Sequence, residues 1–150
     1  MTAVPPHVAV LMATYNGAEF LSEQLDSLAV QTHGNWRLWV SDDGSADATI
    51  DILRRYQKVW REDRLILLSG PGRGFQANFL ELTARPDISA DYYAWSDQDD
   101  VWLPEKLARA LERLEHLGPD RPALYCGRTI LKELLLKIEQ LSGLLIKRES

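Results

Sequence analysis

Short apolar runs alternate with helix-forming segments along the chain, and this alternation constrains its fold more than any other feature. The first run, His7–Ala13, is apolar beyond His7, a pattern typical of a strand buried on both faces of a parallel sheet. Residues 18–30 then carry apolar side chains at helical spacing. The same unit recurs. Later segments predict strands at 36–40, 64–69, 92–96 and 123–126, and helices at 47–60, 75–84 and 104–117.

Strands and helices that alternate in this way predict an α/β fold, with a Rossmann-like, mostly parallel sheet of doubly wound type flanked by helices. In such sheets ligands bind outside the carboxyl ends of the strands. The loops that follow the first four predicted strands should therefore lie along one edge. These loops are 14–17, 41–45, 70–74 and 96–102.

Composition excludes several classes of protein. The 150 residues are 45% hydrophobic and 26% charged, which suits one globular domain. A net charge of −5 argues against a nucleic-acid partner, because phosphate backbones are bound mainly through clusters of Lys and Arg. Cys126 is the only cysteine, no signal-peptide pattern opens the chain, and no apolar run approaches the ~20 residues of a membrane span. We therefore expect a cytoplasmic location.

The loop after the fourth predicted strand is strongly acidic. Asp97, Asp99 and Asp100 lie within four residues, shortly before a predicted helix. Carboxylates held together raise one another's pKa unless a cation lies between them. A hard divalent ion is commonly bound by one or two carboxylates together with substrate phosphates. The plainer alternative is a solvated turn whose acids favour the helix N-terminus, and this loop alone leaves both interpretations open.

Each of the other loops also has a plain structural explanation. Tyr15 could cover the sheet edge, 43–45 could form a turn with Asp47 as helix cap, and the glycines of 70–74 could merely connect a strand to a helix. Convergence of the loops on one edge favours a ligand site instead. An aromatic face, a carboxylate that accepts a base N–H, a loop rich in backbone amides and a metal-binding carboxylate together describe a site for a nucleoside diphosphate.

Other phosphate-binding classes match poorly. Residues 13–17 read A-T-Y-N-G, where a dinucleotide-binding protein would have G-x-G-x-x-G. No P-loop sequence G-x-x-x-x-G-K-[ST] occurs. A receiver domain would need an acidic pair after the first strand and a lysine after the fifth, and neither is present.

Three segments, in order, carry a resemblance to a known family: 8–17, 41–49 and 95–107. They resemble the family 2 inverting glycosyltransferases of the GT-A fold. The S-D-Q-D-D-V-W form of the third segment is similar to the rhamnosyltransferase-like branch that builds bacterial surface polysaccharides. The resemblance implies that residues 1–130 form the N-terminal, nucleotide-sugar-binding part of a glycosyltransferase domain, truncated after about five strands.

The resemblance also implies roles for individual residues in binding the donor. Tyr15 would stack on or beside the donor's base, with Ala13 and Thr14 lining it. Asp42 would accept the ring N–H of the base, and Asp97 would approach the ribose.

Metal and phosphate contacts follow from the same resemblance. Asp99, the second acid of the D-x-D motif, would hold Mg²⁺ or Mn²⁺ bridging the diphosphate, where the metal stabilises the leaving nucleoside diphosphate. Arg73 and Asn78 fall where family members contact donor phosphate or sugar, although Ala77 stands where the family often has Arg. The implied donor is a nucleotide-diphosphate sugar, with dTDP-rhamnose as one candidate, and the implied acceptor is a polysaccharide or glycolipid. Synthesis of cell-surface polysaccharide is compatible with peripheral association at the inner face of the membrane.

An inverting transferase also needs a general base within hydrogen-bond reach of the acceptor hydroxyl. The resemblance places that carboxylate beyond the fifth strand, so no catalytic residue is assigned in this chain. The alternative function is a non-catalytic, nucleotide-sugar-binding or self-associating remnant. Residues 131–150 do not match the family and predict an apolar helix, with a heptad-like seam over 131–146. That helix would either cover the sheet or mediate a homo-oligomer.

Overall fold

The computed structural model describes residues 4–60, 63–117 and 122–127. The chain divides into two compact units, Met1–Arg109 and Ala110–Ser150, and the first unit contains the whole sheet. The apolar helix predicted over 131–150 lies outside the described residues. No helix in the described part is both long enough and apolar enough to cross a membrane.

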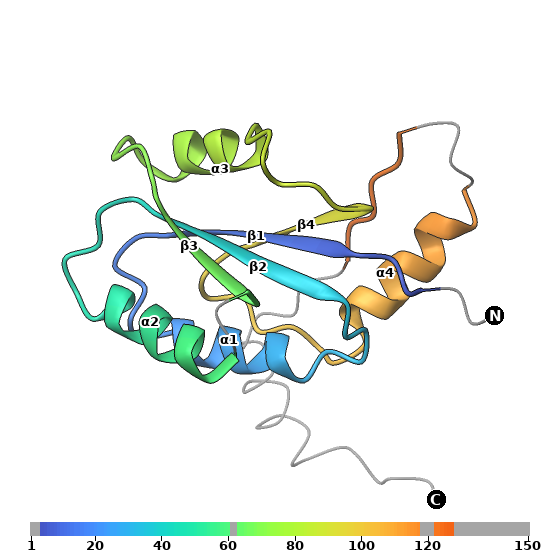
Figure 1. Cartoon of the computed structure of the whole chain (residues 1–150), viewed down its shortest axis with the longest axis horizontal. Coiled ribbons are helices and arrows are strands. Elements are labelled where there is room, and N and C mark those ends of the chain that lie inside the picture. Colours follow the sequence, from blue (N-terminus) through green and yellow to red (C-terminus); the bar gives the residue numbers. More distant parts are fainter. Residues whose placement is uncertain (1–3, 61–62, 118–121, 128–150) are drawn as a thin grey trace, which may run out of the picture. The chain divides into compact units, whose positions relative to one another are not determined.

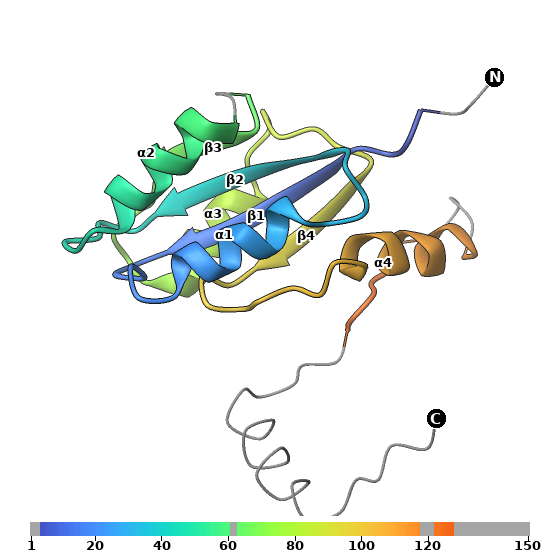
Figure 2. The same cartoon turned by 90° about the horizontal axis from the view of Figure 1, so that it is seen from below.

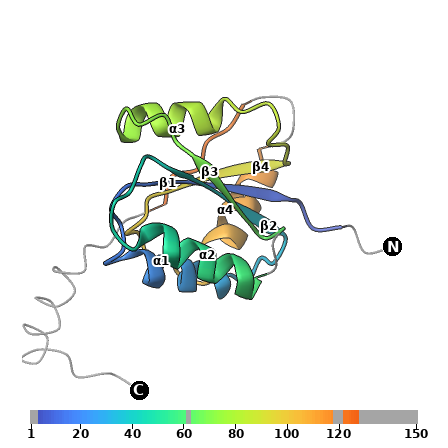
Figure 3. The same cartoon turned by 60° about the vertical axis from the view of Figure 1, so that its left-hand side comes forward.

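Four parallel strands form one sheet in the order β3-β2-β1-β4 (Figure 1). The strands are β1 (Val8–Thr14), β2 (Trp36–Asp42), β3 (Leu65–Ser69) and β4 (Tyr92–Ser96). The helices are α1 (Leu21–Ala29), α2 (Thr49–Trp60), α3 (Phe75–Thr83) and α4 (Lys106–Glu115). Helices α1 and α2 lie on one face of the sheet and α3 lies on the other (Figure 3). The predicted α/β fold is confirmed.

Strand β1 is the centre of the sheet. It pairs with β2 on one side and β4 on the other, and all of its residues are buried. The apolar run located this strand with an offset of one residue, because the polar Thr14 is inside the strand and His7 is outside it. Burial of a β1 side chain on either face therefore removes apolar surface from water and stabilises the fold.

Helices are anchored by apolar side chains at helical spacing. In α1, Leu21, Leu25 and Leu28 are fully buried. On the opposite face of the sheet, Leu82 of α3 belongs to a buried cluster that also contains Ala9, Leu11 and Ile88. The first unit thus has apolar packing on both faces of the sheet.

The fifth strand predicted at 123–126 is wrong. These residues form no strand, and Leu124 and Tyr125 are exposed. A strand forms where its N–H and C=O groups find partners, and a short apolar run between Pro122 and Gly127 does not specify such a partner by itself. The sheet of the first unit therefore has four strands in the described part of the chain.

Two leucines of α3 offer a matched test of this packing. Leu82 is 1% exposed and Leu80 is 70% exposed. We expect Leu82→Ala to lower the free energy of unfolding by about 2–5 kcal/mol, because it leaves a cavity in the buried cluster. Leu80→Ala should change it by less than about 0.5 kcal/mol. Urea denaturation of both variants measures the difference, and equal effects would contradict the assigned packing of α3.

Candidate functional site

The strands of the sheet all run in one direction, so their carboxyl ends bring the distinctive loops to one edge (Figure 2). Thr14 at the end of β1 pairs with Asp42 of β2, which pairs with Ser69 of β3. On the other side of β1, backbone pairing ends where Met12 meets Ser96. The acidic loop therefore begins at the same edge, as the sequence predicted.

Asp42 lies at this edge as a buried carboxylate with four hydrogen-bond donors. Its Oδ1 accepts bonds from Thr14 Oγ1 at 2.8 Å and Ser45 Oγ at 2.6 Å. Its Oδ2 accepts the backbone N–H groups of Gly44 at 3.1 Å and Ser45 at 2.9 Å. These bonds fix the loop after β2. Ala13 and Thr14, at the end of β1, are also buried.

The loops after β1 and β2 are joined to each other by further hydrogen bonds. Asn16 donates its backbone N–H to Ser45 Oγ and accepts the N–H of Ala46 at its own Oδ1, both at 2.8 Å. Asp47 accepts the N–H of Ala18 and, through its other oxygen, two bonds from Thr49. The bond from the Thr49 hydroxyl is the main cause that lowers the pKa of Asp47. The two loops therefore form one connected structure.

Tyr15 projects from this structure and is 58% exposed. Its backbone is held by Gln98 of the acidic loop: the N–H of Tyr15 donates to Oε1 at 3.0 Å, and Nε2 donates to the carbonyl of Tyr15 at 3.2 Å. The ring has no stacking partner among the described residues, so one aromatic surface is available at the edge. Gln98 was not among the residues singled out from the sequence.

The glycine-rich loop 70–74 is held from beneath by Asp43, which is 8% exposed. Its two carboxylate oxygens accept the N–H groups of Gly72 at 2.7 Å and Gly74 at 2.6 Å. Both glycines have positive φ, 67° and 90°, which L-residues rarely adopt. These two N–H groups therefore already bind a carboxylate, and the bonds fix the conformation of the loop.

Arg73 and Asn78 end in different environments. Arg73 lies between the two glycines, is exposed and pairs with Glu81 of α3. Asn78 is 1% exposed, and both ends of its amide bond to Ser41, through the hydroxyl and the backbone carbonyl. Arg73 is thus the member of this pair that a ligand at the surface can reach.

The acidic loop carries surplus negative charge. Partial burial, together with the charges of Asp100 and Asp99, raises the pKa of the Asp97 carboxyl above its ordinary value. Lys106 places its Nζ 4.2 Å from the centroid of the Trp102 ring, and burial lowers its pKa while Asp100 and Asp97 act in the opposite direction. Lys106 is therefore the local cation that faces these acids, and the sequence analysis did not single it out.

Among the described residues, the acidic loop does not form a complete metal site by itself. The described residues contain no group of three or more His, Cys, Asp or Glu side chains arranged to hold an ion. A Mg²⁺ or Mn²⁺ site completed by substrate phosphates needs one or two carboxylates, and residues 97–100 supply hard oxygen ligands whose mutual repulsion a cation would relieve.

A cavity of about 530 Å³ opens at the same edge, within the size range of small-molecule sites. Its lining includes both members of the acidic pair after β2, part of the glycine loop and one basic side chain: Asp42, Asp43, Gly70, Gly72 and Arg54. Arg54 of α2 is a further residue that the sequence analysis missed, because helical spacing marked that segment only as a packing element.

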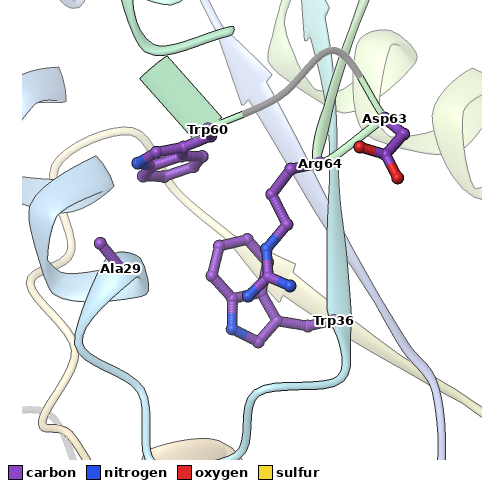
Figure 4. Close-up of a pocket in the computed structure, with 5 residues that line it drawn as sticks. All are labelled: Ala29, Trp36, Trp60, Asp63 and Arg64. Carbon is purple, nitrogen blue, oxygen red and sulfur yellow. The ribbon is translucent and has the colours of Figure 1, made fainter.

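A second pocket, of about 240 Å³, lies near the amino ends of β2 and β3 (Figure 4). The Arg64 guanidinium covers the ring of Trp36 at 3.6 Å from its centroid, and Trp60 meets Trp36 edge to face at 5.6 Å. Arg64 also donates to the carbonyl of Gly34 at 2.9 Å. This pocket contains none of the acidic loops, and we interpret it as packing between α2 and the sheet.

Comparison with known proteins agrees with this geometry. Residues 9–129 match the profile of Glycosyl transferase family 2. The dTDP-rhamnosyl transferase RfbG of Shigella flexneri is 36% identical over 105 residues, which are 69% of this chain and 36% of that protein. The chain spans less than half the length of each curated relative compared with it.

Comparison with solved structures also matches the fold of this chain to those of glycosyltransferases. The mannosyltransferase PcManGT from Pyrobaculum calidifontis, in complex with GDP-Man and Mn²⁺, matches with a TM-score of 0.66 and 28% identity, covering 75% of this chain and 33% of that one. TarS 1–349 of S. aureus, in complex with UDP, matches with a TM-score of 0.60 over 84% of this chain and 38% of its own; at 23% identity it supports the fold alone. The predicted family is confirmed: this chain belongs to glycosyl transferase family 2.

Proposed function

We propose that this chain binds a nucleotide-diphosphate sugar together with Mg²⁺ or Mn²⁺ and forms the donor-binding part of a glycosyltransferase. One observation carries the proposal: in a member of family 2, an exposed aromatic ring and an acidic loop with surplus charge lie at one edge of the sheet. Tyr15 would receive the base, beside the buried Ala13 and Thr14. Asp97 would face the ribose, and Asp99 would hold the metal.

The metal, when bound, would neutralise charge on the diphosphate as it leaves. The chain's own residues bind and orient the donor. Asp42 would accept a base N–H in addition to the bonds that fix its loop, which a carboxylate allows because its two oxygens offer about four acceptor positions. Arg73 would reach donor phosphate or sugar after leaving Glu81, and Asn78 would act from beneath by holding the end of β2.

The sugar and the acceptor are narrower parts of the proposal. A name among the relatives, dTDP-rhamnosyl transferase, makes dTDP-rhamnose a candidate donor, and a GDP-Man complex among the matching structures makes GDP-mannose another. The acceptor would be a saccharide of a cell-surface polysaccharide or glycolipid. No described residue is assigned as the general base, so donor binding and sugar transfer are tested separately.

The direct experiment titrates the chain with dTDP, GDP and UDP in Mn²⁺ and in EDTA, and then measures release of nucleoside diphosphate from the corresponding sugars with and without an oligosaccharide acceptor. Metal-dependent binding of one nucleotide supports the donor site. Acceptor-dependent release would add transferase activity of the chain itself, whereas binding without release would indicate the non-catalytic alternative. Absence of all nucleotide binding would overturn the proposal.

Asp99 provides the first mutational test. We expect Asp99→Asn to lower nucleotide affinity in Mn²⁺ by roughly 10-fold or more, since even outer-shell changes at metal sites cost about 10–100-fold in metal affinity. Affinity in EDTA should stay the same. Asp100→Asn, in the same exposed loop, is the matched control and should have a smaller effect. Isothermal titration calorimetry measures the affinity of both variants. If Asp99→Asn binds the nucleotide in Mn²⁺ as tightly as the unmodified chain does, Asp99 is not a metal ligand.

Asp97 provides a pH-dependent test. Its raised pKa means that the folded chain holds the proton more tightly than the unfolded chain does, so ionisation of Asp97 destabilises the fold as the pH rises through that pKa. In EDTA at pH 7, Asp97→Asn should therefore melt at a higher temperature than the unmodified chain. The difference should disappear below about pH 4, where aspartates protonate. Thermal melts of Asp97→Asn and of the exposed control Asp51→Asn check this, and a difference independent of pH would contradict it.

Asp43 provides a test of the glycine loop. In Asp43→Asn one acceptor oxygen becomes an amide donor, so hydrogen exchange at Gly72 or Gly74 should accelerate, with a loss of about 1–3 kcal/mol in stability. Gly70 is the internal control, because its N–H donates to the carbonyl of Asp42 at 2.7 Å and does not depend on the Asp43 side chain. Amide exchange followed by NMR distinguishes the three glycines. Equal protection at Gly72 and Gly74 in both proteins would contradict the anchoring role of Asp43.

A further inference from the structure

We propose that Gln98 is a positioning residue that couples nucleotide binding to metal binding, by joining the loop that carries Tyr15 to the loop that carries Asp97 and Asp99. The inference rests on the proposed donor site and adds a residue to it. Gln98 does not contact the donor in this scheme. It acts through the backbone of Tyr15.

The hydrogen bonds of Gln98 continue the sheet beyond its last backbone pair. Pairing between β1 and β4 ends at Met12 and Ser96. Two residues past β4, the side-chain amide of Gln98 accepts the N–H of Tyr15 at 3.0 Å and donates to the carbonyl of the same residue at 3.2 Å. A primary amide that donates and accepts on one residue imitates the peptide group of a neighbouring strand. Tyr15 is therefore held to the acidic loop at both of its backbone polar groups.

Gly17 leaves the space that this arrangement needs. A Cβ added at Gly17 would lie 2.2 Å from Oε1 and 2.5 Å from Cδ of Gln98, far inside contact distance. The φ angle of Gly17 is not positive, so its backbone conformation does not explain why this position holds a glycine. The close approach of the Gln98 side chain does. Gly17 and Gln98 thus offer two independent ways to break the same contact.

Coupling between metal binding and nucleotide binding follows from the position of Gln98 in the chain, between Asp97 and Asp99. Asp97, Asp99 and Asp100 lie within four residues of one another, so their ionised carboxylates repel one another. A cation that relieves this repulsion orders the acidic loop. The side-chain amide of Gln98 then also restricts the backbone of Tyr15, through its two hydrogen bonds. The loop that carries Tyr15 is then already ordered when a nucleotide binds, so nucleotide binding no longer includes the free-energy cost of ordering it. Metal binding and nucleotide binding are therefore cooperative. By linkage, the nucleotide must strengthen metal binding by the same factor.

A contact that only stabilised the fold would behave differently. Its loss would lower the melting temperature, but in folded protein the metal would still raise nucleotide affinity by the original factor. The decisive quantity is therefore the ratio of the nucleotide dissociation constants in EDTA and in Mn²⁺. This ratio compares two states of one variant, so a uniform loss of affinity cancels.

The experiment titrates dTDP, GDP and UDP into the unmodified chain and three variants, in EDTA and in Mn²⁺, at a temperature below each variant's melting transition. Gln98→Met keeps the length of the side chain and removes both hydrogen bonds. Gly17→Ala leaves Gln98 in the sequence but displaces it. Gly34→Ala is the matched control, because nothing lies within 4 Å of its added Cβ.

We expect the ratio to fall at least about fivefold in Gln98→Met and Gly17→Ala, the lower end of typical coupling between sites, and to stay unchanged in Gly34→Ala. If Gly17→Ala does not fold, Gln98→Met decides. A ratio in Gln98→Met within twofold of the unmodified chain would overturn this inference while leaving the donor site in place. If the unmodified chain itself binds no nucleotide in a metal-dependent way, the proposed function fails and this inference fails with it.

Discussion

Parallel pairing of β1 with both of its neighbours is the constraint on which the rest of this unit depends. Because β2 and β4 run in the same direction as β1, their carboxyl ends meet at one edge. Segments more than 80 residues apart, such as the loops of Tyr15 and Gln98, can then bond directly. Because β1 is buried on both faces, a shift of one residue would exchange the side chains packed against the two helical layers.

The carboxylates at this edge form two groups, which differ in the number of hydrogen-bond donors around them. Asp42 and Asp43 are buried, and between them they accept six hydrogen bonds, four from backbone N–H groups. Such bonds fix the conformations of the two loops that donate them. Asp97 has no comparable set of donors, and its pKa is raised. The first pair therefore shapes the site, whereas the acidic loop retains charge that an incoming cation can neutralise.

Periodicity predicted the four strands of the sheet, their parallel direction and the edge where the loops meet, because the strands and helices that alternate along the chain are visible as local patterns of burial. It failed at 123–126, where a short apolar run has no strand partner in the described chain. It also missed Asp43, Gln98 and the burial of Asn78. Each depends on hydrogen bonds between residues at least 29 positions apart, which no local pattern encodes. Gly17 was the available signal for Gln98, but a glycine after a strand has many explanations.

Under the proposed function, a diphosphate bound at this edge would be accompanied by a cation. The glycine loop cannot serve as a phosphate cradle through Gly72 and Gly74, since Asp43 holds both of their N–H groups. The same bond at Gly74 places a negative charge at the start of α3, where an anion would otherwise be attracted. Arg73 is paired with Glu81, and a net charge of −5 repels an anion at long range. Under the proposed function, a metal that arrives with the diphosphate would offset this repulsion, and the acids of 97–100 are the groups at this edge that would gain most from receiving it.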